Sequence, residues 1–192
     1  GCGSDIGTHA YEFVRFVAGL KVVRLMARMK SVVLGRVLDD DFTVLAELNN
    51  GAIATISASQ IITGAENDNG FRVVGTTGTL SWTHSRPERL EHYRADQPVR
   101  LYRQGADYSY MPASIRPYMR LPAGHPEGFH EALANLHRTL EWQIRRGWGD
   151  TSAPVPFEHP GINDGVAGMA FIEAAVRSAS EESAWVDVPK AG

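Results

Sequence analysis

The sequence predicts an α+β fold in which an open, mostly antiparallel sheet carries helices on one of its faces. Three observations support this class. A helical pattern comes first, alternating strand patterns follow between residues 21 and 103, and two further helical patterns come last. Helices grouped apart from a run of strands are typical of α+β folds, whereas alternating strands and helices would predict a parallel sheet.

The first helix is predicted over residues 5–20. Its apolar residues recur every three or four positions, and Gly19 is a suitable C-terminal stop. Ser4 or Asp5 is the expected N-cap, because a short polar side chain can accept hydrogen bonds from the free amides of the first turn.

The strand region is clearest at residues 41–60, where two alternating runs flank Asn49-Asn50-Gly51. This tripeptide predicts the tight turn of a hairpin. The other predicted strands span residues 21–33, 71–82, 88–94, 99–103 and 184–188. Small polar residues such as Thr55 and Ser57 alternate along the hairpin, which favours an antiparallel sheet with helices on its other side.

Residues 105–127 are rich in proline, glycine and aromatic residues and predict a long, ordered loop. Helices are predicted on either side of a shorter connection, over residues 129–146 and 163–183. The first of these has an apolar stripe of Leu133, Leu136, Leu140 and Ile144. Glu141 and Arg145 are expected to pair on its wet side.

Length and composition predict one soluble domain over residues 1–192. Hydrophobic residues make up 43% of the chain and charged residues 21%, which is typical of a globular protein. The net charge of −3 argues against nucleic acid as a partner, and no apolar run is long enough to cross a membrane. Cys2 is the single cysteine, so no internal disulfide is possible and a cytoplasmic location is the simplest expectation.

Asp5 and His9 are four positions apart in the predicted first helix, so their side chains share one face. One interpretation is structural: Asp5 caps the helix and His9 is a solvated surface residue. The other interpretation is catalytic. The helix dipole disfavours the protonated form of His9 and the Asp5 carboxylate favours it, and these opposing effects together suit a general base. Gly7, which has no side chain, would leave space for a substrate between them.

A metal site is the third interpretation of this pair, and we expect none. Aspartate and histidine at this spacing can share an ion, but a third ligand is needed. The candidates are scattered (His125, Glu127 and His130), and no cysteine or histidine cluster has the spacing of a zinc site. No glycine-rich dinucleotide or phosphate-binding motif follows a predicted strand.

Five segments, in order, resemble one protein family. They are GSDIGTHAYEFVRFVAGL, NNGAIATISASQ, FRVVGTTGTLSW, AGHPEGFHEALANLHR and NDGVAGMAFIEAAVRSASEESAWVDV, which together extend from residue 3 to residue 188. The family is that of glucose–fructose oxidoreductase, inositol dehydrogenase and MocA (Gfo/Idh/MocA), which are NAD(P)-dependent oxidoreductases. The resemblance implies the same open antiparallel sheet with helices on one face.

The resemblance covers the C-terminal half of the family's architecture. The family's N-terminal Rossmann domain and its Glu-Lys-Pro segment have no counterpart in this sequence. We therefore expect a single substrate-binding and oligomerisation domain over residues 1–192, a fragment of a two-domain dehydrogenase. The cofactor-binding residues would lie in the missing domain, so the chain alone is expected to bind no cofactor and to be inactive.

Asp5 and His9 match the family's catalytic Asp-x-x-x-His pair. The resemblance implies that His9 exchanges the proton of a sugar or polyol hydroxyl while hydride passes to NAD or NADP, and that Asp5 orients His9 and contacts substrate. His125 and Asn67 are candidate substrate-binding residues on loops. The family also implies a homo-oligomer, dimer or tetramer, formed through the open sheet face. The alternative is a sugar-binding or dimerisation module with no catalytic role.

Overall fold

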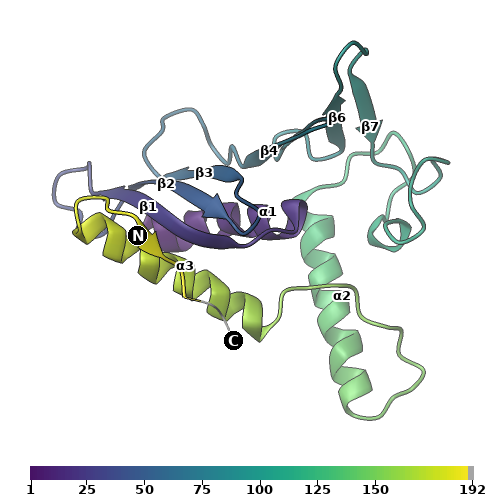
Figure 1. Ribbon diagram of the computed structural model, residues 1–192. Coiled ribbons are helices and arrows are strands. Elements are labelled where there is room, and N and C mark those ends of the chain that lie inside the picture. The colour runs from purple at the N-terminus through teal and green to yellow at the C-terminus, as the bar shows by residue number, and fades with distance from the viewer. Residues whose placement is uncertain (190–192) are drawn as a thin grey trace. The chain divides into compact units, whose positions relative to one another are not determined.

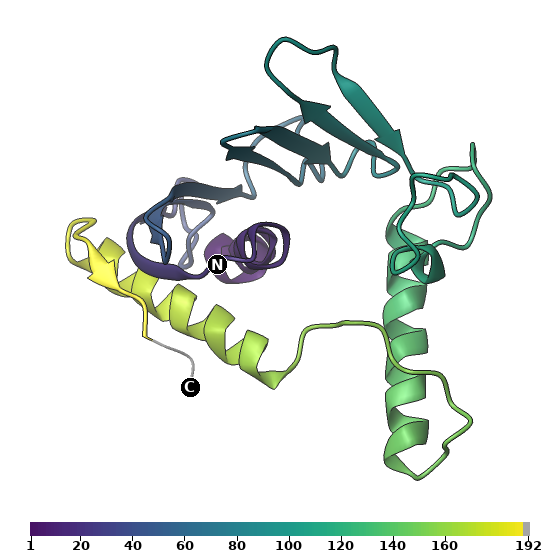
Figure 2. The same cartoon turned by 45° about the vertical axis from the view of Figure 1, so that its right-hand side comes forward.

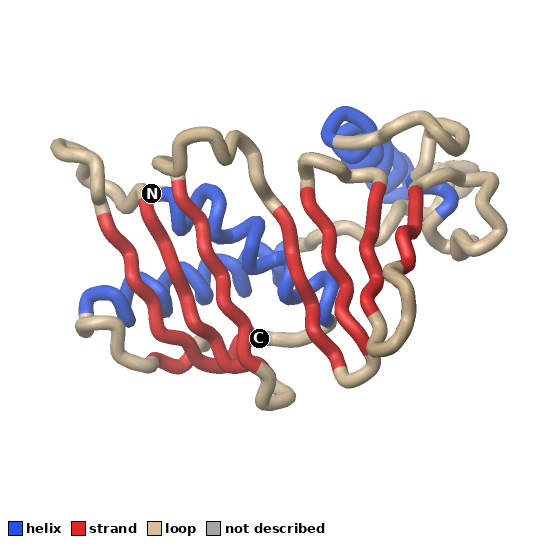
Figure 3. The backbone as a smooth tube through the Cα atoms, turned by 90° about the horizontal axis from the view of Figure 1, so that it is seen from above, coloured by secondary structure: helices blue, strands red, loops and turns tan. Residues whose placement is uncertain are grey.

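The computed structural model describes residues 1–189, which group into two compact units. Unit 1 comprises Gly1–Glu66 and the residues from Pro160 onward, and unit 2 comprises Asn67–His159. Each unit contains one four-stranded antiparallel sheet (Figure 3). The α+β class is thus confirmed, with the predicted strands divided between two open sheets. That residues 1–192 act as one domain stays a prediction.

The sheet of unit 1 has the strand order β3-β2-β1-β8. Its strands are β1 (Val22–Lys30), β2 (Asp41–Leu48), β3 (Ile53–Ser59) and β8 (Val186–Asp187). The predicted hairpin turn joins β2 to β3, and Gly51 there has a φ of 84°, a value that favours glycine. Because side chains alternate along each strand, one face of this sheet is buried and apolar, whereas the other is exposed and mixes polar residues such as Thr55 with apolar ones such as Leu45 and Ile53.

Three helical segments belong to unit 1: η1 (Gly3–Gly7), α1 (Thr8–Ala18) and α3 (Ile162–Ser180). The helices α1 and α3 lie along the same face of the sheet (Figure 1). Phe171 of α3 lies at the centre of the core, where its ring stacks on Tyr11 at 4.3 Å and meets Phe42 edge-on at 6.2 Å. Burial of these aromatic rings is a large share of the apolar area that holds helices to sheet.

Ser178 fixes α3 to the neighbouring strand by hydrogen bonds inside the core. Its buried hydroxyl accepts from the amide of Ala27 in β1 at 2.8 Å and donates to the carbonyl of Ala184 at 2.6 Å. Both contacts satisfy groups that would be costly to bury unpaired.

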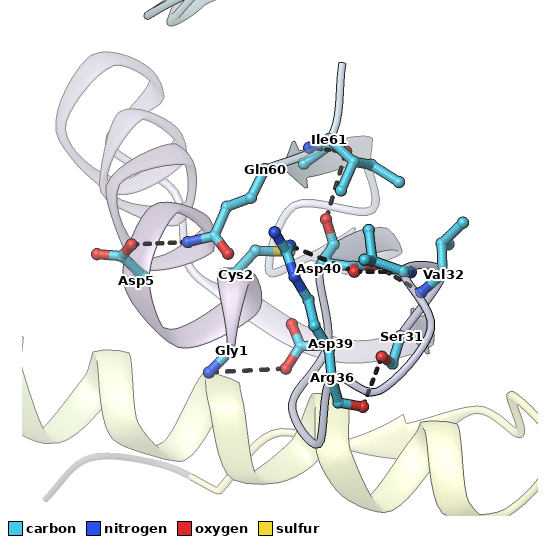
Figure 4. Close-up of polar contacts among 12 residues, drawn as sticks. Gly1, Cys2, Asp5, Ser31, Val32, Arg36, Asp39, Asp40, Gln60 and Ile61 are labelled. Atoms are coloured by element: carbon cyan, nitrogen blue, oxygen red, sulfur yellow. Dashed lines mark hydrogen bonds and ion pairs between the residues drawn. The ribbon is translucent and has the colours of Figure 1, made fainter. Parts of the chain in front are cut away.

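Asp40 organises the loop between β1 and β2. The carboxylate is fully buried and accepts from the amides of Val32 and Val33 at 2.7 and 3.0 Å, and from Arg36 Nη1 at 3.3 Å (Figure 4). These contacts, the Val32 amide first, hold the pKa of Asp40 below its ordinary value. The buried charge of Asp40 therefore orders the loop, although the apolar side chains Leu34 and Val37 of the loop are exposed.

Unit 2 pairs its sheet in the order β4-β5-β6-β7. Its elements are β4 (Gly70–Gly75), β5 (Gly78–Thr83), β6 (Arg89–Tyr93), β7 (Arg100–Arg103), η2 (Arg116–Tyr118) and α2 (Phe129–Gly147). The segment after α2 turns back along that helix (Figure 2), where Phe157 packs on Trp142 at 5.2 Å and on Tyr118 at 4.3 Å. Loops thus cover one side of α2.

The predicted apolar stripe of α2 lies on a different side of the helix from these contacts. Its four residues are 42–53% exposed. The loops pack instead on Asn135, Arg138 and Trp142, because the guanidinium of Arg138 stacks over Trp142 and donates to the Pro117 carbonyl at 2.8 Å. The predicted pair is present, with Arg145 Nη1 3.1 Å from Glu141 Oε1.

Within residues 1–189, no helix is both long and apolar enough to cross a membrane.

Replacing Asp40 by asparagine is expected to destabilise the chain in a pH-dependent way. Because the folded-state pKa of Asp40 is lowered, its charge stabilises the fold above the ordinary pKa of about 4, and this contribution is lost as the pH falls through the lowered value. Urea unfolding should therefore show a lower midpoint for Asp40→Asn at pH 7. The difference from the unmodified chain should narrow below about pH 4.

Asp41→Asn is the matched control, because Asp41 is the adjacent residue and is only half-buried. It should change the urea midpoint little at either pH. A pH-independent difference for Asp40→Asn would show that the asparagine disturbs packing rather than removing a stabilising charge.

Candidate active site

The Asp5 carboxylate is held by a side chain from outside its own helix. Gln60, directly after β3, donates from Nε2 to Asp5 Oδ2 at 3.0 Å (Figure 4). Asp5 lies inside η1, a π-helical turn, and neither N-cap residue, Cys2 for η1 or Gly7 for α1, makes a side-chain cap. The predicted N-cap role of Ser4 or Asp5 is therefore wrong, because the helical backbone already begins at Gly3. Single π-helical turns are frequent at functional sites.

Two glycines let η1 approach the sheet closely. A Cβ atom built on Gly3 would lie 2.7 Å from the Phe42 ring, and one built on Gly7 would lie 2.9 Å from it. Both distances are shorter than packed carbon atoms tolerate. Gly7 therefore faces the core, and the expectation that it leaves space for a substrate is wrong. Its small size is needed by Phe42.

The start of η1 is hydrogen-bonded to the end of the β1–β2 loop. The amide of Cys2 donates to the Asp39 carbonyl at 2.8 Å, and the amide of Gly3 donates to Asp39 Oδ2 at 2.7 Å. The Cys2 thiol is buried against the Ala58 carbonyl, and burial is the main cause that raises its pKa to about 12. Such a thiol carries no thiolate near neutral pH and is no nucleophile.

The same loop positions Gln60. The amide of Gln60 donates to the carbonyl of Asp40 at 2.9 Å, so the residue that organises the loop also fixes the backbone of the residue that holds Asp5. Asp39, Asp40 and Gln60 thus connect three segments of unit 1 through short polar contacts (Figure 4).

A groove of about 480 Å³ opens beside these contacts. It is lined by Gly1, Asp5, Arg36, Val37, Leu38, Asp39 and Gln60. Its carboxylates can accept from ligand hydroxyl groups, the Gln60 amide and the Arg36 guanidinium can donate, and Val37 and Leu38 supply an apolar wall. This mixture of groups suits a small, hydroxyl-bearing molecule.

His9 lies in the first turn of α1, four residues after Asp5, and is exposed. Both predicted catalytic residues therefore belong to unit 1 and to one continuous helical stretch. The hydrogen bond recorded for the Asp5 carboxylate within residues 1–189 is the one from Gln60. The expectation that Asp5 orients His9 stays a prediction.

The two predicted substrate-binding residues belong to unit 2, and both are exposed. Asn67 precedes β4, and its carbonyl accepts from the amide of Asn69 at 2.9 Å. His125 lies in a turn, and its backbone amide donates to the carbonyl of Pro122 at 3.2 Å. Their roles stay predictions.

Glu127, two residues after His125, is an internal anchor. Its buried carboxylate accepts from the amides of Arg120 and Leu121 and from Gln104 Nε2 at 3.1 Å. These donors leave it poorly suited as a metal ligand, and no group of three His, Cys, Asp or Glu side chains within the described residues is arranged to hold a metal ion.

Sequence reasoning missed Gln60 and Asp40, and it considered Glu127 only as a scattered candidate metal ligand. Each acts by hydrogen bonding to segments that are distant or irregular, and such contacts have no periodic signal. The only sequence hint is positional, since Gln60 follows directly on the clearest predicted hairpin.

A family model described as the GFO/IDH/MocA C-terminal domain matches residues 1–81. Among curated proteins, the uncharacterized oxidoreductase YfiI of Bacillus subtilis (strain 168) is 30% identical over 186 residues, which cover 95% of this chain and 47% of that protein.

Solved structures of oxidoreductases resemble nearly the whole chain. An oxidoreductase from Sinorhizobium meliloti is 36% identical with a TM-score of 0.87, covering 97% of this chain and 52% of that one. An inositol dehydrogenase homolog from Azotobacter vinelandii, complexed with NADH and myo-inositol, is 30% identical with a TM-score of 0.85, covering 95% of this chain and 48% of that one. The chain spans about half the length of these relatives. The chain thus matches the model of the GFO/IDH/MocA C-terminal domain over residues 1–81, and the relatives that resemble nearly all of it are named as oxidoreductases or as an inositol dehydrogenase homolog.

Proposed function

We propose that this chain is the substrate domain of an NAD(P)-dependent oxidoreductase that acts on a sugar or polyol hydroxyl, with His9 as the acid/base and Asp5 as a substrate contact. The observation that carries the proposal is the Gln60–Asp5 hydrogen bond of 3.0 Å at the wall of a groove, at the start of the helix that carries His9. The Azotobacter vinelandii relative, solved with NADH and myo-inositol, supports the reaction class.

The chemistry assigned to this chain is proton transfer and substrate orientation. An alcohol carbon gives up hydride readily only as its hydroxyl proton is removed, so a neutral imidazole at His9 would take that proton. Asp5 has a carboxylate oxygen to accept from a second substrate hydroxyl while Gln60 holds the other oxygen. A positioned base contributes roughly 10²–10⁴ in rate.

We assign binding of the nicotinamide cofactor to residues outside this chain. Every strand pair recorded within residues 1–189 is antiparallel, whereas dinucleotide-binding folds place the cofactor at the carboxyl ends of parallel strands. We therefore expect the 192-residue chain alone to show no turnover. The whole protein, about twice this length by comparison with its relatives, is the form to assay.

We also propose that the sheet of unit 1 forms an interface between two copies through the face away from its helices. Leu45 and Thr55, which are directly opposite each other, lie on that face, and Ile53 beside them is 60% exposed. Small and apolar side chains on a regular surface suit a symmetric contact.

His9→Ala in the whole protein should lower kcat by roughly 10²-fold or more, because the variant has no group to take the hydroxyl proton. The fold should be unaffected, since the side chain is exposed. Steady-state kinetics with a polyol panel and both cofactors would measure the effect, and thermal unfolding would verify the fold.

His130→Ala is the matched control, because His130 is also an exposed histidine near the start of a helix. It should leave kcat unchanged. Full activity of His9→Ala would exclude His9 as the base and would favour a non-catalytic sugar-binding or dimerisation role for the domain.

Gln60→Ala should lower kcat/KM by about tenfold, the effect of one lost hydrogen bond that orients a reacting group. Gln60→Glu should be worse near neutral pH, because it places a second carboxylate against Asp5, and should recover partly as the pH is lowered. Gln143→Ala, an exposed glutamine on α2, is the control. Equal loss for both Gln60 variants at every pH would count against an electrostatic contact with Asp5.

Thr55→Arg should convert a dimer into a monomer, because it places a long charged side chain at the middle of the proposed interface. Light scattering after size-exclusion chromatography would measure the mass. Arg100→Gln on the sheet of unit 2 should leave it unchanged, and a Thr55→Arg protein of unchanged mass would rule out this face.

A further inference from the structure

A small polar hollow lies on the sheet of unit 2. Arg72 of β4 is directly opposite Ser81 of β5, and Ser81 is directly opposite Glu91 of β6, so the three side chains form one row across three strands. Residues directly opposite one another in an antiparallel sheet share a face, so these side chains point the same way.

Two further arginines border this row. Arg86 lies in the turn before β6 and Arg89 is the first residue of that strand. The hollow has a volume of about 220 Å³ and is lined by Arg72, Ser81, Trp82, Thr83, Arg86, Arg89 and Glu91. It exceeds several-fold the roughly 30 Å³ that one water occupies in the liquid, yet is smaller than the roughly 300–1,000 Å³ of pockets for drug-sized ligands.

The positive charge of this hollow is only partly neutralised. Arg89 Nε contacts Glu88 Oε1 at 2.8 Å, and Glu91 Oε2 accepts from the Tyr93 hydroxyl at 2.6 Å. Within residues 1–189, no ion pair and no side-chain hydrogen bond is recorded for Arg72 or Arg86. Three guanidinium groups thus face a single carboxylate in the lining of the hollow, on a chain whose net charge is −3.

The environment of Tyr93 supports this placement. Its hydrogen bond to Glu91 raises the pKa of the phenol, and the positive charges of Arg72 and Arg86 act in the opposite direction. Arginines from two different segments therefore act on the same point of the sheet.

We propose that this hollow binds a phosphate group. A carboxylate offers two oxygens, whereas a phosphate offers three acceptor oxygens and up to two negative charges, which matches three converging guanidinium groups. Arginine presents its donors as a planar fork that binds such oxygens in pairs. Ser81 and Thr83 add hydroxyl donors at the same place. Glu91 would accept from a hydroxyl next to the phosphate.

This site is independent of the proposed oxidoreductase function. All of its residues belong to unit 2, whereas Asp5, His9 and Gln60 belong to unit 1. A failure of either assignment would leave the other unaffected.

The test is a titration of the 192-residue chain with inorganic phosphate at constant ionic strength. Binding is measured by calorimetry and by NMR chemical shifts of the backbone amides. Saturable binding with a dissociation constant on the order of 1 mM is expected, with the largest shifts at residues that line the hollow. Arg72→Gln and Arg86→Gln should each weaken binding by about tenfold or more. Circular dichroism would show that the variants are folded.

Arg100→Gln is the matched control. Arg100 is directly opposite His92, so strand alternation places it on the other face of the same sheet, and the change of charge is identical. Phosphate affinity should change by less than about twofold in this variant, as expected for screened long-range charge.

Three results would overturn the proposal. The first is the absence of saturable phosphate binding. The second is acetate binding as tightly as phosphate at equal ionic strength, which would assign the arginines to a carboxylate. The third is a loss of self-association in Arg72→Gln with phosphate binding unchanged, which would assign them to a second copy of the chain.

Discussion

The contact between Phe42 and two glycines is the constraint on which the architecture of unit 1 depends. Phe42 is fully buried and lies between the sheet, the ring of Phe171 and the π-helical turn η1. Gly3 and Gly7 leave the space that its ring fills, so η1 lies closer to β2 than any turn with side chains at these positions could. Close packing of this kind leaves little freedom of position, because interiors are nearly as dense as organic crystals.

The position of η1 explains the polar contacts around the groove. With η1 held against the sheet, Asp5 comes within hydrogen-bond distance of Gln60, and the amides of Cys2 and Gly3 reach Asp39. Asp40 then orders the loop that carries Asp39 and fixes the backbone of Gln60. The apolar contact determines where the segments meet, and the hydrogen bonds determine which polar atoms face the groove.

Much of the fold follows from periodicity in the sequence. The hairpin at residues 41–60, the helix at 129–146 and the helix at 163–183 match β2, β3, α2 and α3 within a few residues, because each has a clear apolar repeat and a recognisable end. The division of the strands into two sheets was not predictable in this way. Alternation shows which face a residue takes, but not which strands are neighbours.

The site was predictable only in part, for a related reason. Asp5 and His9 were predicted from their spacing and from resemblance to a family motif, and their roles stay predictions. The cap assigned to Ser4 or Asp5 was wrong because the helical backbone already begins at Gly3, and the opening assigned to Gly7 was wrong because Gly7 packs against the ring of Phe42. Gln60 was missed because its partner is 55 residues away in the sequence.

At the start of the chain, the residues that build the fold are distinct from the exposed polar residues that the proposed function uses. Gly3 and Gly7 are buried against the core, whereas Asp5 in the same π-helical turn and His9 in the first turn of α1 are exposed. Substitution of a buried glycine adds a Cβ atom into the space of Phe42 and strains the core, whereas substitution of Asp5 or His9 removes a polar group without loss of packing. The exposed polar groups of this segment can therefore be substituted with little effect on the packing of the core. The π-helical turn η1 places its glycines inward and Asp5 outward, and His9 follows on the exposed side of α1.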